Sequence, residues 1–109
     1  MSVDGLWTIE FSSSTGFGTG VVVFANGKIL GGDAQYHYTG TYSEAGPRLM
    51  GEVVVRHYTG PLSNVFEQVQ SVRLTVEGST SRDLITAQGY DPTMPQRRVS
   101  LRLRRVTDT

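Results

Sequence analysis

The side chains best suited to proton transfer or metal binding in this chain are its two histidines, His37 and His57. They fall on different expected strands, and neither has a second histidine or a carboxylate at a recognised metal-ligand spacing. Cysteine is absent, which excludes a thiolate metal site and a cysteine nucleophile. A strand histidine with a local hydrogen bond is the favoured interpretation of both, so we expect no metal site. If either one is functional, His57 is the better candidate, because it falls on the expected inner face.

Two further patterns that could carry phosphate binding or catalysis are incomplete. The glycines of Gly16-Phe17-Gly18-Thr19-Gly20 resemble a phosphate-binding loop, but such a loop needs a helix directly after it, and Val21-Val22-Val23 predict a strand. No Gly-x-Ser-x-Gly sequence exists to expose a nucleophilic serine. Carboxylates such as Glu52 and Glu77 fall on expected solvent faces, with no paired acid or base. We therefore expect no enzymatic activity and no cofactor.

Basic residues concentrate at the end of the chain, where the last thirteen residues hold five of the ten: Arg97, Arg98, Arg102, Arg104 and Arg105. Three of them, Arg98, Arg102 and Arg104, share one face of an expected strand. They form either a stripe for an acidic partner or a solvated face that resists edge pairing. Ten acidic residues balance the ten basic ones, and no aromatic side chains interleave the stripe. We therefore expect no direct nucleic-acid binding.

The most informative feature is a row of tyrosines, Tyr36, Tyr38 and Tyr42, whose spacing places them on one face of a strand with Gly40 as a gap. If the row faces inward, it makes an aromatic lumen wall suited to a small apolar ligand. If it faces outward, it has the composition of an interface anchor. Ordinary core or cross-strand packing is the third interpretation. The candidate lumen residues are Trp7, Tyr36, Tyr42 and His57.

The elements that would position these side chains are strands. The chain has 28 β-branched residues (13 Val, 3 Ile and 12 Thr) but only four Ala and one Lys, a mixture that favours strands over helices. Alternation with period two predicts strands at about 4–12, 19–25, 28–31, 35–43 and 48–58, a sixth ending near 77, and two more at 83–89 and 97–106. Asn26-Gly27 predicts a two-residue hairpin turn, whereas Thr59–Glu67 and Tyr90–Gln96 are expected loops.

Eight short antiparallel strands joined in order favour an all-β, eight-stranded antiparallel up-and-down β-barrel, because closure leaves no open edge. A sandwich is the alternative. The 109 residues suit a single domain spanning 1–109. No run of apolar residues is long enough for a membrane helix, and Met1–Gly5 lacks the regions of a signal peptide. We therefore expect a cytoplasmic protein that does not bind membranes.

Several short motifs occur in an order that resembles one known family. They are Asp4-Gly5-Leu6-Trp7, the run Gly20-Val21-Val22-Val23 into Asn26-Gly27-Lys28, Gly31-Gly32-Asp33, Tyr36-x-Tyr38-x-Gly40-Thr41-Tyr42, and Arg56-His57-Tyr58-Thr59-Gly60-Pro61. Together they resemble the GrlR-type negative regulators of type III secretion. The resemblance covers roughly residues 4 to 66 well, and the remainder only by strand pattern.

The resemblance implies a small lipocalin-like (calycin-like) barrel that dimerises and takes part in transcription regulation by binding a transcriptional activator directly. The family's partner-binding feature is an acidic Glu-Asp-Glu-Asp loop after the strand that matches Gln35–Ser43. Here Ser43-Glu44-Ala45-Gly46-Pro47 occupies that position, and only Glu44 carries over. The candidate partner-binding residues are Glu44, Arg48, Tyr36, Tyr38 and Tyr42. The alternative function is a small-ligand carrier or sensor with an aromatic lumen.

Overall fold

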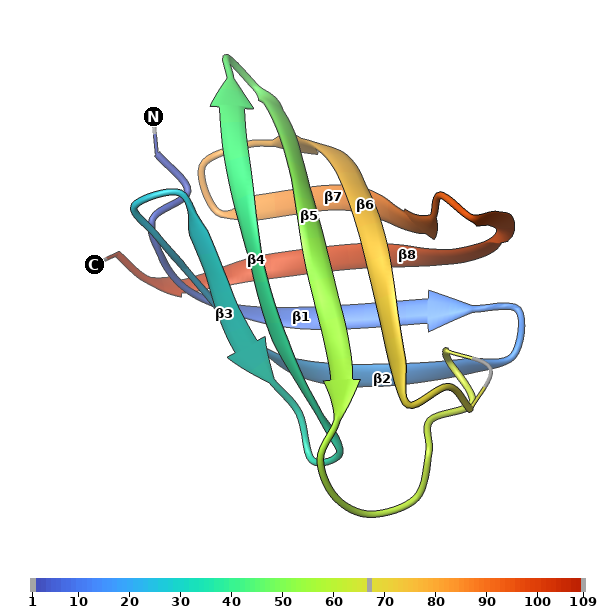
Figure 1. Ribbon diagram of the computed structural model, residues 1–109. Coiled ribbons are helices and arrows are strands. Elements are labelled where there is room, and N and C mark those ends of the chain that lie inside the picture. Colours follow the sequence, from blue (N-terminus) through green and yellow to red (C-terminus); the bar gives the residue numbers. More distant parts are fainter. Residues whose placement is uncertain (1, 67, 109) are drawn as a thin grey trace.

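The eight expected strands form a closed antiparallel barrel (Figure 1). The computed structural model describes residues 2–66 and 68–108. The strands are β1 (Gly5–Ser13), β2 (Gly16–Ala25), β3 (Lys28–Gly32), β4 (Tyr36–Ala45), β5 (Arg48–His57), β6 (Ser71–Thr80), β7 (Leu84–Asp91) and β8 (Met94–Thr107). Each strand pairs with the next, and β8 pairs with β1. This up-and-down order is that of lipocalin-like barrels; it confirms the predicted fold class, and the sandwich alternative is wrong.

Alternating side chains divide each strand between the barrel interior and the outer surface. In β6, for example, Val72, Leu74 and Val76 are buried, whereas Arg73 and Glu77 are exposed. Opposite faces of a strand therefore carry the predicted apolar and polar residues. The interior is the hydrophobic core of the protein.

Glycines allow the sheet to turn sharply enough to close. Asn26 and Gly27 both have positive φ angles, 52° and 81°, which confirms the predicted turn between β2 and β3. Gly31 and Gly40 lie inside strands at points where an added Cβ would overlap a backbone carbonyl of the neighbouring strand. Glycines at such places permit tight bends at barrel corners. As a result, β3–β6 run across β1, β2, β7 and β8 (Figure 1).

Two strands are longer than the sequence predicted. β2 begins at Gly16 rather than Thr19, because Gly18 has no side chain and the Phe11 ring fills the space that a Cβ would need. β8 begins at Met94, which reduces the predicted loop at 90–96 to a tight turn. Asp91 forms that turn by accepting the backbone N–H of Thr93 at 2.9 Å and its hydroxyl at 2.7 Å.

The connection between β5 and β6 closes one end of the barrel (Figure 1). Its residues Val65 and Phe66 are buried, and the Phe66 ring stacks on Phe11 with ring centres 5.7 Å apart. The sequence suggests a helical turn capped by Asn64 with Glu67; the structure has an irregular turn at 64–66, and Glu67 lies outside the described residues. None of the residues described forms a helix that could cross a membrane.

Candidate functional site

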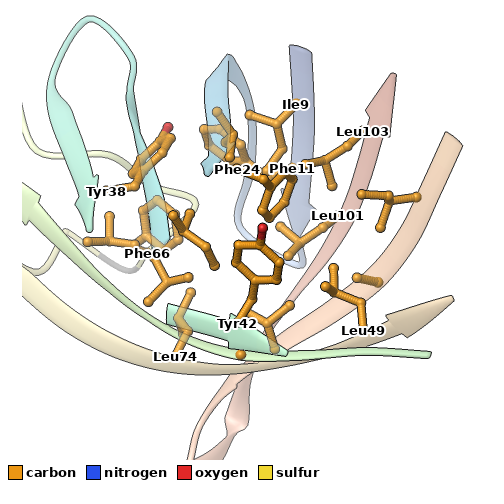
Figure 2. A pocket seen from close by; sticks show the side chains of 18 residues that line it. Ile9, Phe11, Phe24, Tyr38, Tyr42, Leu49, Phe66, Leu74, Leu101 and Leu103 are labelled. Atoms are coloured by element: carbon orange, nitrogen blue, oxygen red, sulfur yellow. The ribbon is translucent and has the colours of Figure 1, made fainter. Parts of the chain in front are cut away.

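The barrel lumen holds an apolar cavity of about 70 Å³. Figure 2 shows aromatic and aliphatic side chains converging on it, among them Tyr38, Tyr42 and Phe66. A cavity needs at least about 10–15 Å³ to hold one water, but apolar cavities stay dry, and one of about 150 Å³ holds benzene. With its side chains in place, this lumen therefore admits only a ligand smaller than benzene.

The predicted tyrosine row faces this interior. Tyr36 is 0% exposed and Tyr38 is 5% exposed, while Tyr42 is half-buried. The shared face is confirmed, and the outward alternative is wrong because a partner protein cannot reach the buried rings. Of the predicted lumen residues, Tyr42 borders the cavity, whereas Trp7, Tyr36 and His57 lie outside its lining. Tyr38, which was not among them, also borders it.

The hydroxyl groups of the two lining tyrosines point to carboxylates rather than into the cavity. Tyr38 donates to Asp33 Oδ2, and burial together with this carboxylate raises the pKa of Tyr38 far above its usual value. Tyr42 donates to Asp4 Oδ1, and burial and Asp4 raise the pKa of Tyr42 to about 12. Both hydroxyls are therefore protonated at neutral pH, and they offer the lumen only their rings.

At the end of the barrel that the β5–β6 connection closes, Tyr36 and His57 hold this connection in place by hydrogen bonds. The Tyr36 hydroxyl donates to the Val69 carbonyl at 2.7 Å and accepts the Ser63 N–H at 3.0 Å. His57 Nε2 donates to the Gly60 carbonyl at 2.7 Å, and its ring packs edge-on against Tyr36 with centres 5.3 Å apart. His57 thus makes the local hydrogen bond typical of a structural histidine.

At the opposite end, Trp7 and Arg105 tie the chain termini to the barrel. Trp7 is fully buried, and its Nε1 donates to the Val3 carbonyl at 2.8 Å. The Arg105 guanidinium stacks 4.5 Å above the Trp7 ring and donates to the carbonyls of Asp4 and Ser2 at 2.9 and 3.0 Å. Arg105 pairs directly with Trp7 and lies on the same inward face of β8 as Leu101 and Leu103. The sequence signal for this contact was the pair Arg104-Arg105, which places a charged residue where the alternation of apolar and polar residues predicts an apolar one.

Three basic residues near the C-terminus form the expected outer stripe. Arg98, Arg102 and Arg104 point outward from β8, and Arg98 stacks on Tyr90. Arg97 instead pairs with Asp91 at 3.1 Å. The hydroxyl and N–H of Thr93, followed by Arg97, hold the pKa of Asp91 below its usual value. Three arginines along β8 are therefore available to an acidic partner.

The turn between β4 and β5 is exposed except for its acidic residue. Ala45, Pro47 and Arg48 are exposed, and Gly46 adopts the positive φ of 59° that the turn requires. The Glu44 carboxylate points toward the barrel end, where Oε2 accepts the Val3 N–H at 3.4 Å. Its Oε1 is buried and has no hydrogen-bond partner within residues 2–66 and 68–108. Arg48 is therefore accessible to a partner, but Glu44 is not presented to one.

A row of four apolar residues and one threonine crosses the outer face of five strands, and it is not evident from the sequence alone. Five outward-facing residues lie directly opposite one another in the strand registers; we call them the outer row: Leu6, Val23, Leu30, Thr39 and Val54. Leu30 is 48% exposed, and the neighbouring Val21 is 47% exposed. The available signals were the runs Val21-Val22-Val23 and Val53-Val54-Val55, since three successive valines place valine on both faces of a strand.

The described residues bring together no group of three or more His, Cys, Asp or Glu side chains that could hold a metal ion. Neither a protein-family model nor a curated protein matches the sequence. The resemblance to GrlR-type regulators therefore stays a prediction, and function must be argued from the geometry of the barrel.

Proposed function

We propose that this protein is a non-enzymatic interaction protein that binds other protein molecules through the outer face of β3–β5. The observation that carries the proposal is the outer row, which places apolar Leu30 and Val54 on the outer face of β3–β5. Removing exposed Leu30 and partly buried Val54 from water would stabilise a complex by about 25 cal/mol for each Å² of apolar surface. An apolar stripe of this kind is a common mark of a protein–protein interface.

The regulatory part of the proposal rests on the resemblance described above. By this resemblance, the chain is a cytoplasmic negative regulator and its protein partner is a transcriptional activator. The exposed residues of the β4–β5 turn, Ala45, Pro47 and Arg48, offer a second contact at the position of the family's partner-binding loop. Because that turn keeps only one acidic residue, whose carboxylate points into the barrel end, contact there would involve Arg48 and apolar atoms.

A photo-crosslinking residue at position 30 tests the proposal, with the same residue at position 86 as the control. Leu30 and Thr86 both point outward and are exposed, but they lie on β3 and β7. In the source cells, irradiation is expected to give protein-sized adducts at position 30 and none at position 86. Equal adducts at both positions, or none at position 30, would contradict an interaction through this face.

The lumen cavity favours a second candidate function, the binding of a small apolar ligand. Its lining of aromatic and aliphatic carbon excludes polar ligands, which would lose their hydrogen bonds with water. Trp7 packs edge-on against Phe24, which borders the cavity, so ligand entry should alter Trp7 emission. A saturable change with molecules smaller than benzene would support this candidate, and a flat response across such a panel would rule it out.

A further inference from the structure

Two arginines and a histidine come together on the outer face of β4–β6, beside the outer row. Arg73 lies directly opposite Val54 across β5 and β6, and Arg56 follows Val54 by two residues on the same face of β5. The two arginines are therefore diagonal neighbours. His37 lies directly opposite Arg56 on β4. All three side chains are exposed, and we call them the basic cluster.

The arginines of the basic cluster are not neutralised by the residues around them. Neither Arg56 nor Arg73 makes an ion pair or a side-chain hydrogen bond with any residue in 2–66 or 68–108. Glu52 lies on the same face, diagonal to Arg73, but it makes no ion pair with those residues either. Because two like charges side by side repel each other, the cluster does not stabilise the barrel. Its charges are available to another molecule.

Apolar and aromatic side chains border the basic cluster on both sides. Val54 precedes Arg56 by two residues, and Tyr58 follows it by two. Tyr58 is 54% exposed, and its ring stacks on His37 with the ring centres 5.9 Å apart. The Tyr58 hydroxyl donates to the Asp33 carbonyl at 2.7 Å, which fixes the ring on the surface. Tyrosine and arginine are enriched among the residues that contribute most to protein interfaces, so this region has the composition of a binding surface.

We propose that the outer face binds an acidic segment of another protein, whose carboxylates pair with Arg56 and Arg73 while its apolar side chains cover Leu30 and Val54. This inference rests on the proposed function and names the chemistry of the partner of that same face. A guanidinium can bind a carboxylate through two parallel N–H···O bonds. A partner that covers the neighbouring apolar side chains also removes water, which strengthens each ion pair.

The surroundings of the basic cluster favour an acidic protein over a nucleic acid. A phosphate backbone could pair with the arginines, but it would leave the apolar surface of Leu30 and Val54 exposed to water. It would also bring further negative charge beside Glu52. The chain has a formal net charge of zero, so it lacks the overall positive charge that attracts nucleic acids over long distances.

The arginine stripe of β8 is less suited to the same partner and supplies a matched control. Arg102 lies directly opposite Glu10, which offsets its charge, and Arg98 stacks on Tyr90. No apolar row of this kind accompanies the stripe. Arg104 is exposed on β8, away from the basic cluster, so its reversal changes the net charge of the chain without changing the proposed site.

Fluorescence anisotropy with a short labelled peptide that alternates aspartate and leucine tests the proposal. The wild-type chain should bind this peptide at least about tenfold more tightly than the same peptide with asparagine in place of aspartate. Arg56→Glu and Arg73→Glu should each weaken binding at least about tenfold, whereas Arg104→Glu should weaken it less than about threefold. An acidic peptide that does not bind, or equal weakening by Arg104→Glu, would overturn the proposal.

Exchange of charge identifies what the face recognises. A peptide that alternates lysine and leucine should bind the double variant R56E/R73E more tightly than it binds the wild type. Glu52→Gln should tighten binding of the acidic peptide about twofold, because it removes a repelling charge next to Arg73. If labelled single-stranded DNA binds the wild type more tightly than the acidic peptide does, the cluster recognises phosphate and the acidic protein partner is refuted.

The two proposals fail in different ways. The side chains changed here are exposed, so circular dichroism should show that each variant keeps its fold. If the crosslinker at position 30 captures the same protein in wild type and in R56E/R73E, with equal yield, the acidic partner is refuted and the interaction face stands. If position 30 captures nothing and the acidic peptide does not bind, both proposals fall.

Discussion

The two faces of β3–β5 differ in how their polar groups are satisfied. On the inner face, the hydroxyls of Tyr36, Tyr38 and Tyr42 all donate to a carbonyl or a carboxylate of the same chain. On the outer face, Glu52 and Arg56 have no partner among the described residues, although Leu30 and Val54 place apolar surface between them. The tyrosine hydroxyls of the inner face are satisfied within one chain, whereas the outer face leaves these two charges and part of its apolar surface exposed to solvent.

Neighbouring residues show the same division. Val55 is 3% exposed and packs in the core, whereas Val54, one residue earlier, lies in the outer row. Burial of a valine on folding stabilises the barrel, whereas the part of an outward valine that stays exposed can be buried only in a complex. Substitutions on the inner face should therefore change the free energy of unfolding, and those on the outer face should change association.

The largest loss of stability is expected for Trp7→Ala. This change removes a fully buried ring, its hydrogen bond to Val3 and its contact with Arg105. It should lower the free energy of unfolding by about 4 kcal/mol, measured by urea denaturation. Leu30→Ala is the outer-face control, and in the monomer it should change that free energy by less than about 0.5 kcal/mol. Similar losses for both variants would erase the distinction between the faces.

A somewhat smaller loss is expected for Phe66→Ala, at about 3 kcal/mol, because Phe66 belongs to a loop rather than a strand. Phe66 stacks on Phe11 and borders the cavity, so its removal also enlarges the lumen. The variant should bind benzene, seen as a saturable change in Trp7 emission, whereas the wild-type chain should not. Benzene binding to the wild type with equal affinity would show that the loop does not limit the size of the lumen.

The tyrosine hydroxyls allow a finer comparison within the inner face. Tyr38→Phe leaves the buried Asp33–Tyr38 contact without its donor and should cost about 2 kcal/mol. Tyr42→Phe makes the same chemical change at a half-buried position and should cost about 1 kcal/mol. Urea denaturation of both variants, side by side, measures the difference. The reverse order would show that burial does not set the strength of these bonds.

The smallest expected effect is the pH dependence of stability in alkaline solution. The pKa of Tyr42 is raised from 10.0 to about 12, so between these values the unfolded chain loses the proton while the folded chain keeps it. The stabilisation is fully present below pH 10 and is lost as pH rises through about 12. Tyr42→Phe should reduce this decline in the unfolding midpoint, and an unchanged decline would exclude Tyr42 as a cause.

The sequence alone predicts the barrel well because its strands alternate regularly and Asn26-Gly27 admits one kind of turn. It also predicts that the tyrosine row shares a face, since that follows from period two. It cannot predict that the tyrosine hydroxyls reach Asp33 and Asp4, because these contacts depend on how strands close in space. The outer row was missed for the same reason. Its members lie on different strands and become neighbours only through the register.

The central claim is that the inner face sets the stability of the barrel and the outer face sets its association with other proteins. The variant Leu30→Glu tests this claim most directly, because its partner binding and its free energy of unfolding can both be measured. Leu30 is 48% exposed at the centre of the outer row, so a carboxylate there remains solvated in the monomer and becomes costly only when a partner covers it. We predict that the variant no longer copurifies with the protein that the crosslinker at position 30 captures in the source cells. The free energy of unfolding of the isolated chain should stay within about 0.5 kcal/mol of wild type. A variant that still binds that protein, or that loses several kcal/mol of stability, would contradict the assignment of this face to protein contact.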